Sequence, residues 1–239
     1  SDLGVDPAHV RLHLVPTDRV WLRDSGPTAV QGPQGIEWVR WSFNAWAKYD
    51  NFRKDALVAD AVARISGLPS AAAQRPDGRG PLVLEGGGIE TNGTGAMLVT
   101  EEWLLSDVQV RNPGLSASDY EQAFARHLGI SRTIWLGEGA VGDDTHGHVD
   151  DLARFADEHT VLLAYEPDPA DENHARSIDN LRRLTLAAER FPGGLRVVKL
   201  PFPQPVVMEG ERLPASYANF YVARSEEHTS ELQSRLHLV

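Results

Sequence analysis

The 239-residue chain contains no cysteine. Disulfides, thiolate metal sites and a cysteine nucleophile are therefore excluded for the chain as given. Long apolar runs are also missing, so neither a membrane-spanning helix nor a membrane partner is predicted. The first ten residues have no basic start and no apolar stretch, so they do not predict a signal peptide. We accordingly expect a cytoplasmic protein.

Basic residues are scarce relative to acidic ones, with 23 Lys and Arg against 34 Asp and Glu and a net charge of −11. A surface that binds nucleic acid needs clustered Lys and Arg, so nucleic acid is not an expected partner. A small cationic ligand is compatible with this balance. The hydrophobic share of 41% is that of an ordinary globular protein. The length of 239 residues is enough for one large domain or two small ones. No signal for an oligomeric state is evident.

Hydrophobic periodicity predicts paired strands separated by helices. The predicted strands cover residues 10–15, 28–30, 36–43, 81–84, 96–100, 133–136, 148–155, 161–165, 195–200 and 217–222. Helices are predicted from Asp50 to a stop at Gly67, from Ser116 to Gly129, and over residues 171–191. This order favours α/β units of a hairpin plus a helix, packed around an axis, over a doubly wound parallel sheet.

One short stretch concentrates titratable groups, with four carboxylates and two imidazoles in residues 143–151. Residues i and i+2 of a strand share a face, so His146 and His148 with Asp144 or Asp150 would chelate one ion in a metal-dependent hydrolase. Alternatively, the carboxylates clamp a cation while His148 transfers protons. A third interpretation makes His148 a hydrogen-bonded core residue.

Seven short motifs occur in one order along the chain. They are Trp21-x-Arg23-Asp24-x-Gly26-Pro27, Phe43-Asn44-Ala45-Trp46, Leu84-Glu85-Gly86-Gly87, Thr100-Glu101-Glu102, Arg111-Asn112-Pro113, Gly147-His148-Val149-Asp150 and Tyr217-x-Asn219-Phe220-Tyr221. Together they resemble the agmatine deiminase family, close to the bacterial-type peptidylarginine deiminases. The resemblance runs from about Val15 to Val222.

The resemblance implies the pentein fold, a five-bladed pseudo-symmetric α/β-propeller with its active site on the axis. It also implies hydrolysis of a guanidinium group to a ureido group without a cofactor. Agmatine would become N-carbamoylputrescine and ammonia, a step of putrescine biosynthesis. Agmatine and peptidyl-arginine both remain candidate substrates.

By the same resemblance, Asp24 and Asp150 match two aspartates that bind the guanidinium, and His148 matches the general acid and base. The positions that match the lining of the substrate channel are Trp21, Glu85 and Asp144. A guanidinium is a flat cation whose forked N–H donors suit carboxylates, so the residue types fit the assignment. His146 stands where many relatives carry another residue, which favours the cation clamp and no metal.

In the implied mechanism, a cysteine thiolate attacks the guanidinium carbon and a thiouronium intermediate is then hydrolysed. Relatives carry that cysteine near the C-terminus, beyond the matching region. We therefore expect residues 1–223 to be an internal fragment, an incomplete propeller that is inactive alone. Residues 224–239 resemble translated sequencing adapter and are expected to be a non-native tail. The alternative without catalysis is a protein that only binds agmatine or arginine.

Overall fold

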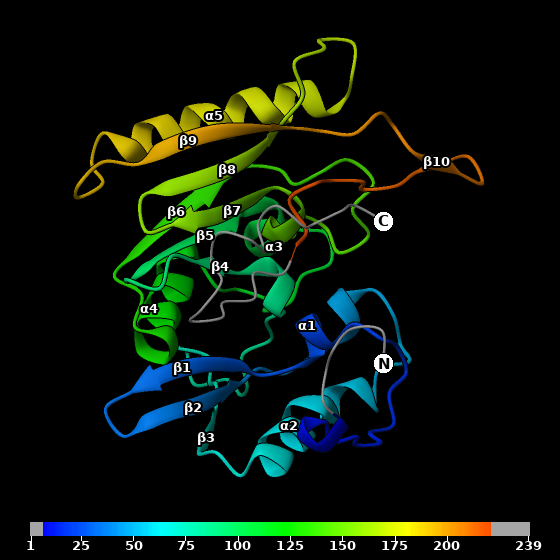
Figure 1. Cartoon of the computed structure of the whole chain (residues 1–239), viewed down its shortest axis with the longest axis vertical. Coiled ribbons are helices and arrows are strands. Elements are labelled where there is room, and N and C mark those ends of the chain that lie inside the picture. Colours follow the sequence, from blue (N-terminus) through cyan, green and yellow to red (C-terminus); the bar gives the residue numbers. More distant parts are fainter. Residues whose placement is uncertain (1–6, 221–239) are drawn as a thin grey trace.

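The computed structural model describes residues 7–220 (Figure 1). The adapter-like tail at 224–239 and the end of the strand predicted at 217–222 lie outside the described residues. Three three-stranded sheets follow one another along the long axis of the molecule, and a small two-stranded hairpin lies near the end of the described chain. In the described part of the chain, no helix is both long and apolar enough to cross a bilayer.

The three large sheets share one plan. Each begins with an antiparallel hairpin, and a helical segment then leads to a third strand that pairs in parallel with the second. Two parallel strands run in the same direction, so the chain must return from the end of one strand to the start of the next. A tight turn cannot do this, and a longer crossover is needed. The predicted hairpin-plus-helix units are thus confirmed, and each carries an added parallel strand.

The first unit contains β1 (Thr28–Gly32), β2 (Gly35–Arg40), α2 (Val58–Ser66) and β3 (Ser70–Ala72). The second contains β4 (Glu90–Thr91), β5 (Ala96–Thr100), α3 (Glu101–Leu105), α4 (Ala117–Leu128) and β6 (Arg132–Leu136). The third contains β7 (Ala153–Asp157), β8 (Thr160–Tyr165), α5 (Asn173–Ala188) and β9 (Arg196–Pro201).

Short elements join these units. They are η1 (Pro7–His9), α1 (Leu22–Ser25), η2 (Ala45–Ala47), η3 (Asp55–Leu57), η4 (Gly86–Gly88), η5 (Val149–Asp151) and the hairpin of β10 (Val207–Met208) and β11 (Glu211–Arg212). Among them, η4 contacts both α1 and η5. Residues from all three units therefore meet at these short helical turns.

Local sequence signals set the ends of the helices. Ser116 and Asp119 form a capping box at the start of α4, with each side chain accepting from the other residue's backbone N–H. Gly129 ends this helix and Gly67 ends α2, both with positive φ, 67° and 68° respectively. Glycine adopts this left-handed conformation without a steric cost, so both stops are confirmed.

Five predicted elements differ from the structure, one of them the strand predicted at 217–222, whose described residues 217–220 form no strand. Residues 10–15 form no strand, and the side chains of Leu12 and Leu14 are exposed. The helix expected from Asp50 begins only at η3 and α2, because the Arg19 guanidinium holds Asn51 outside the helix by two hydrogen bonds of 2.6 and 2.7 Å. Residues 81–84 are joined to neighbours only by isolated bridges, and residues 149–151 turn before β7 begins.

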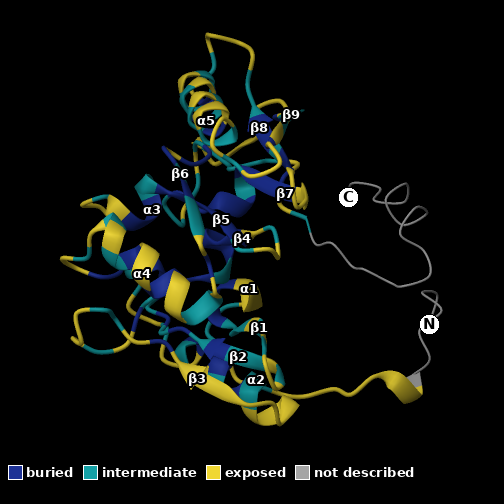
Figure 2. Ribbon diagram, turned by 90° about the vertical axis from the view of Figure 1, so that its left-hand side faces the viewer, coloured by how far each residue is buried: buried dark blue, intermediate teal, exposed yellow. Residues whose placement is uncertain are grey.

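The core lies between the units. Every residue of β5 is buried, and Figure 2 shows β4 and β5 in the interior with exposed faces on the outer helices. Met97 and Val99 pack into a cluster shared with the first unit, whereas Ala96 and Leu98 pack into a cluster shared with the third. Because alternate side chains of a strand point to opposite faces, the middle sheet is covered on both sides. The expected α/β class is confirmed, and closure into a propeller stays a prediction.

Candidate active site

The candidate site lies where α1, η4 and η5 meet. A cavity of about 530 Å³ opens there. Its wall consists of Arg19, Trp21, Arg23, Asp24, Trp46, Tyr49, Asp143, Asp144, Thr145, His148, Asp150, Asp151, Pro214 and Asn219. The wall thus includes every residue that the sequence singled out for the site except Glu85.

Gly87 is the point on which the reactive groups converge. Its backbone N–H donates to Asp24 Oδ1 over 2.9 Å. A Cβ atom at this position would lie 2.6 Å from His148 Nδ1, 2.7 Å from Asp24 Oδ1 and 3.0 Å from Asp150 Oδ2. These separations leave no room for a side chain, which explains why this motif has glycine between strand and turn.

His148 is almost completely buried and lies between acids. Its Nδ1 is 3.8 Å from Asp24 Oδ1, and its Nε2 is 3.3 Å from Glu85 Oε2. Burial alone would lower the pKa of His148, but the charges of Asp24, Glu85 and Asp150 outweigh it and raise the pKa to about 9. The imidazole is therefore protonated at neutral pH and is able to donate a proton to a bound group.

The carboxylates of Asp24 and Asp150 both lie beside Gly87, and each is anchored by another side chain. Trp46 Nε1 donates to Asp24 Oδ2 over 3.1 Å. Arg23 Nε lies 3.0 Å from Asp150 Oδ2. Burial raises the pKa of Asp150, although His148 and Arg23 pull it down. The two carboxylates form a small anionic pair in the cavity wall.

Glu85 lies one layer behind the cavity, with no exposed surface. Arg111 Nε donates to its Oε1 over 3.2 Å, and Trp103 Nε1 donates to its Oε2 over 2.6 Å. Burial would raise the pKa of Glu85, but Arg111, His148 and Trp103 together lower it. The sequence placed Glu85 at the substrate channel, whereas the structure makes it a buried anion in contact with His148.

The motifs assign no role to Asp143, although it belongs to the acidic stretch. Its carboxylate accepts from the backbone N–H groups of Thr145, Gly147 and His148 over 2.8, 2.9 and 2.9 Å. Asp commonly bonds to backbone N–H groups a few residues ahead in this way, so Asp before a glycine-containing turn is the usable signal. Asp143 thereby holds the loop that presents His148.

Asp144 lies at the rim of the cavity, with 53% of its side chain exposed. It accepts from Tyr49 Oη over 2.7 Å and forms an ion pair with Lys48. It therefore links the 143–148 loop to the aromatic loop, where Trp46 has a positive φ of 59°. The Arg19 guanidinium lies 4.6 Å from the Tyr49 ring centroid, so cations as well as acids line this rim.

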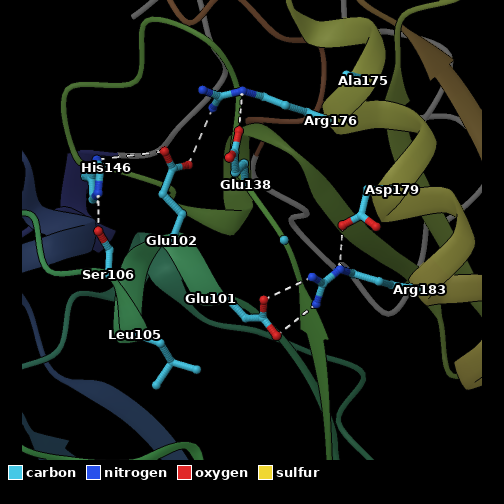
Figure 3. A pocket seen from close by; sticks show the side chains of 11 residues that line it. Glu101, Glu102, Leu105, Ser106, Glu138, His146, Ala175, Arg176, Asp179 and Arg183 are labelled. Atoms are coloured by element: carbon cyan, nitrogen blue, oxygen red, sulfur yellow. Dashed lines mark hydrogen bonds and ion pairs between the residues drawn. The ribbon is translucent and has the colours of Figure 1, made fainter.

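His146 and His148 do not form the metal chelate of the alternative interpretation. His146 lines a different pocket of about 710 Å³ between α3 and α5, where its Nε2 is 3.0 Å from Ser106 Oγ (Figure 3). Its φ is 63° and that of Gly147 is 93°, so the chain turns here and the two imidazoles do not share a strand face. Among the residues that the structure describes, no three His, Asp or Glu side chains are grouped to hold a metal ion.

Comparison with known proteins agrees with this geometry. A family model described as Porphyromonas-type peptidyl-arginine deiminase matches residues 2–226. The agmatine deiminase of Ectopseudomonas mendocina is 36% identical over an alignment of 242 positions. This alignment covers 91% of this chain and 64% of that protein.

Solved structures give the same result. The agmatine deiminase of Enterococcus faecalis is similar with a TM-score of 0.73 and 31% identity, covering 86% of this chain and 60% of that chain. A C. jejuni agmatine deiminase with substrate bound gives a TM-score of 0.74 at 29% identity, and the match covers 86% of this chain and 58% of that chain. The chain spans 63 or 64% of the length of several curated relatives that it matches.

Proposed function

Because this chain belongs to the Porphyromonas-type peptidyl-arginine deiminase family, we propose that its cavity binds the guanidinium group of a small cation. We further propose that the chain forms the binding and proton-transfer part of a guanidine deiminase. The observation that carries the proposal is the convergence of Asp24, Asp150 and His148 on the bare backbone of Gly87. The family resemblance stated from the seven motifs is itself confirmed.

Two buried carboxylates suit a guanidinium better than an ammonium ion. A guanidinium is planar and presents paired N–H donors, so two carboxylates on opposite sides can each accept from one edge. Asp24 and Asp150 would take these edges, and Trp21 would cover the aliphatic part of the ligand at the cavity wall. Agmatine is the preferred substrate candidate, since the similar enzymes are named agmatine deiminases.

The proposed reaction consumes one water and replaces one nitrogen of the guanidinium. The guanidinium and water give a ureido group and an ammonium ion, so atoms and charge balance. His148 starts protonated, gives its proton to the departing ammonia, and as neutral imidazole then takes a proton from the attacking water. Glu85 and Asp24 hold positive charge on His148 until the proton leaves.

The attacking group is proposed to be a thiolate, which would form a covalent bond to the guanidinium carbon and leave when water hydrolyses it. None of the 239 residues is a cysteine, so this chain does not supply that group. We therefore propose that the chain alone binds the substrate without turnover. On the same basis, its three units would correspond to three blades of a five-bladed propeller.

Calorimetry with agmatine tests the binding proposal. Putrescine has the same chain of carbons and an ammonium in place of the guanidinium, so it should bind at least tenfold more weakly. Asp24→Asn and Asp150→Asn should each weaken agmatine binding roughly tenfold or more, since each removes a charge-assisted hydrogen bond. Glu189→Gln, an exposed acid at the end of α5, is the control for lost charge.

Equal binding of putrescine and agmatine, or unchanged binding in both aspartate variants, would rule out the guanidinium site. An arginine-containing peptide tests the second substrate class in the same experiment. Ammonia release from agmatine above background by the purified chain would contradict only the prediction that the chain is inactive.

A further inference from the structure

Two motifs have no role in the proposed chemistry, Thr100-Glu101-Glu102 and Arg111-Asn112-Pro113. The structure brings both to one place behind the cavity. Trp103, in the helix that begins at Glu101, and Arg111 both direct N–H donors at the carboxylate of Glu85. These groups are fully enclosed, with Trp103 1% exposed and the side chains of Arg111 and Glu85 at 0%.

The two carboxylate oxygens of Glu85 have different hydrogen-bond partners. Oε1 accepts from Arg111 Nε over 3.2 Å. Oε2 accepts from Trp103 Nε1 over 2.6 Å and lies 3.3 Å from His148 Nε2. The indole and the imidazole thus share one oxygen, and the shorter bond belongs to the indole.

The rings of Trp103 and His148 are also held against each other. Their centroids lie 5.7 Å apart with the planes at 83°, an edge-to-face contact. A Cβ at Gly88 would lie 2.4 Å from the indole, so the Gly88 backbone packs directly against that ring. Thr100 Oγ1 accepts from Trp103 N over 3.1 Å and donates to the carbonyl of Gly147, next to His148. The indole therefore has little freedom to move away from Glu85.

We propose that Trp103 is a positioning residue for the proton on His148. Its indole N–H takes the larger share of Glu85 Oε2, which limits how strongly that oxygen holds His148 Nε2–H and leaves Nδ1 facing Asp24 and the cavity. Indole is suited to this role because it is a donor that carries no charge and never accepts. The inference rests on the proposed function in one respect, that His148 is the residue which moves the proton.

The direction of the effect follows from the charges around the imidazole. His148 faces Asp24 of α1, Glu85 ahead of η4 and Asp150 of η5, with Arg111 behind Glu85 and Arg23 beyond Asp150. Removing the indole N–H leaves this set of charges unchanged. It frees Glu85 Oε2 for His148 alone, so the imidazolium is held more strongly and its pKa should rise.

Trp103→Phe removes the donor and keeps an aromatic ring, and Trp135→Phe is the matched control. Trp135 Nε1 donates to the exposed carboxylate oxygen Oε1 of Glu121 over 2.8 Å, and not to Glu85. The pKa of His148 is measured by NMR of ring-labelled histidine without ligand, with His148→Gln assigning the signal. We expect Trp103→Phe to raise the pKa of His148 by roughly half a unit or more and Trp135→Phe to leave it unchanged.

An unchanged or lowered pKa of His148 in folded Trp103→Phe would overturn the proposal, even if that variant melts earlier. The unmodified chain supplies a second measurement that does not depend on the variant folding. If the two rings share Oε2, the indole N–H resonance of Trp103 must shift as His148 titrates, whereas that of Trp135 must not. An indole resonance of Trp103 that ignores the His148 titration would overturn the proposal as well.

Both measurements are made without a guanidinium ligand. Failure of agmatine to bind would therefore count against the proposed function and leave the shared oxygen intact. Conversely, normal agmatine binding together with a silent Trp103 resonance would remove only the role given to Trp103.

Discussion

His148 Nε2 and Glu85 Oε2 lie 3.3 Å apart with both side chains enclosed by protein. This contact joins the loop before β7 to the turn before β4, 63 residues apart in the chain. An imidazolium beside a buried carboxylate is favoured over the neutral ring, and that preference couples the folded state to pH.

Stability should therefore depend on the charge of His148. The pKa of His148 rises from 6.5 to about 9 on folding, so its stabilising effect is complete below pH 6.5 and is lost as the pH rises through 9. The unfolding free energy of the wild type should exceed that of His148→Gln by a margin that shrinks across this window, on the order of a few kcal/mol in total. Urea unfolding at several pH values measures the margin. A margin that stays constant between those limits would contradict the prediction.

Asp151 should act in the opposite sense to an ordinary surface acid. Burial, and then the neighbouring charges of Asp150 and Asp143, raise the pKa of Asp151 from 3.8 to about 7. Its contribution is therefore fully present below pH 3.8 and is lost as the pH rises through 7, because the ionised form is disfavoured in the fold.

Asp151→Asn should stabilise the protein above pH 7, by on the order of a few kcal/mol, and change little near pH 4. Asparagine keeps an oxygen for Asn219 Nδ2, which donates to Asp151 Oδ1 over 3.1 Å. Melting temperatures of Asp151→Asn and of Asp107→Asn, an exposed acid, give the comparison. Equal stability of Asp151→Asn and wild type above pH 7 would contradict the predicted stabilisation.

Gly87→Ala should abolish ligand binding, because its Cβ would meet His148, Asp24 and Asp150 at 2.6 to 3.0 Å. We expect at least a tenfold loss of agmatine affinity and a destabilisation of about 1–3 kcal/mol from overpacking. Gly32→Ala is the control, since the nearest atom to a Cβ there is Glu37 Oε1, the end of a flexible side chain, at 2.7 Å, and the nearest backbone atom is at an ordinary 3.5 Å. Wild-type affinity in Gly87→Ala would show that the site is looser than described.

Asp143→Asn should loosen the loop that carries His148. One oxygen of Asp143 accepts from both Gly147 N and His148 N, and the other accepts from Thr145 N. An amide has a single acceptor oxygen, so one end of the loop loses its partners, at about 1–3 kcal/mol. Urea unfolding measures this loss.

Asp157→Asn is the matched control for that variant. Asp157 Oδ1 accepts from His159 N over 2.8 Å in the β7–β8 turn, and an amide oxygen can replace it there. Equal destabilisation of the two variants would argue against a special role of Asp143.

The sequence predicted turns and helix ends well where they depend on a few neighbouring residues. Asn92-Gly93 lies in the turn between β4 and β5, and Ser116 caps α4, as expected from their chemistry. The alternation over residues 10–15 was misleading, because alternation predicts a strand only when another strand lies beside it. The alternative interpretation of His146 and His148 as a metal chelate is wrong for a related reason. The positive φ values at His146 and Gly147 turn the chain, so the two side chains do not lie on one strand.

The site was only partly predictable. Asp24, His148 and Asp150 were named from the motifs, and the structure brings them to one cavity, although their roles stay predictions. The enclosure of Glu85 was not visible, since Arg111 and Trp103 reach it from 26 and 18 residues away. Periodicity reports neighbours along a strand or helix and carries no information on such distant partners.

The burial of β5 on both faces has a consequence for how the molecule divides. Its Met97 and Val99 belong to one core cluster and its Ala96 and Leu98 to another, and each cluster also contains residues of a neighbouring unit. The repeating unit of the topology is thus not an independent unit of stability. Amide protons of β5 should exchange with solvent only when neighbouring units open together, and a cut between units would expose the apolar side chains of a shared cluster.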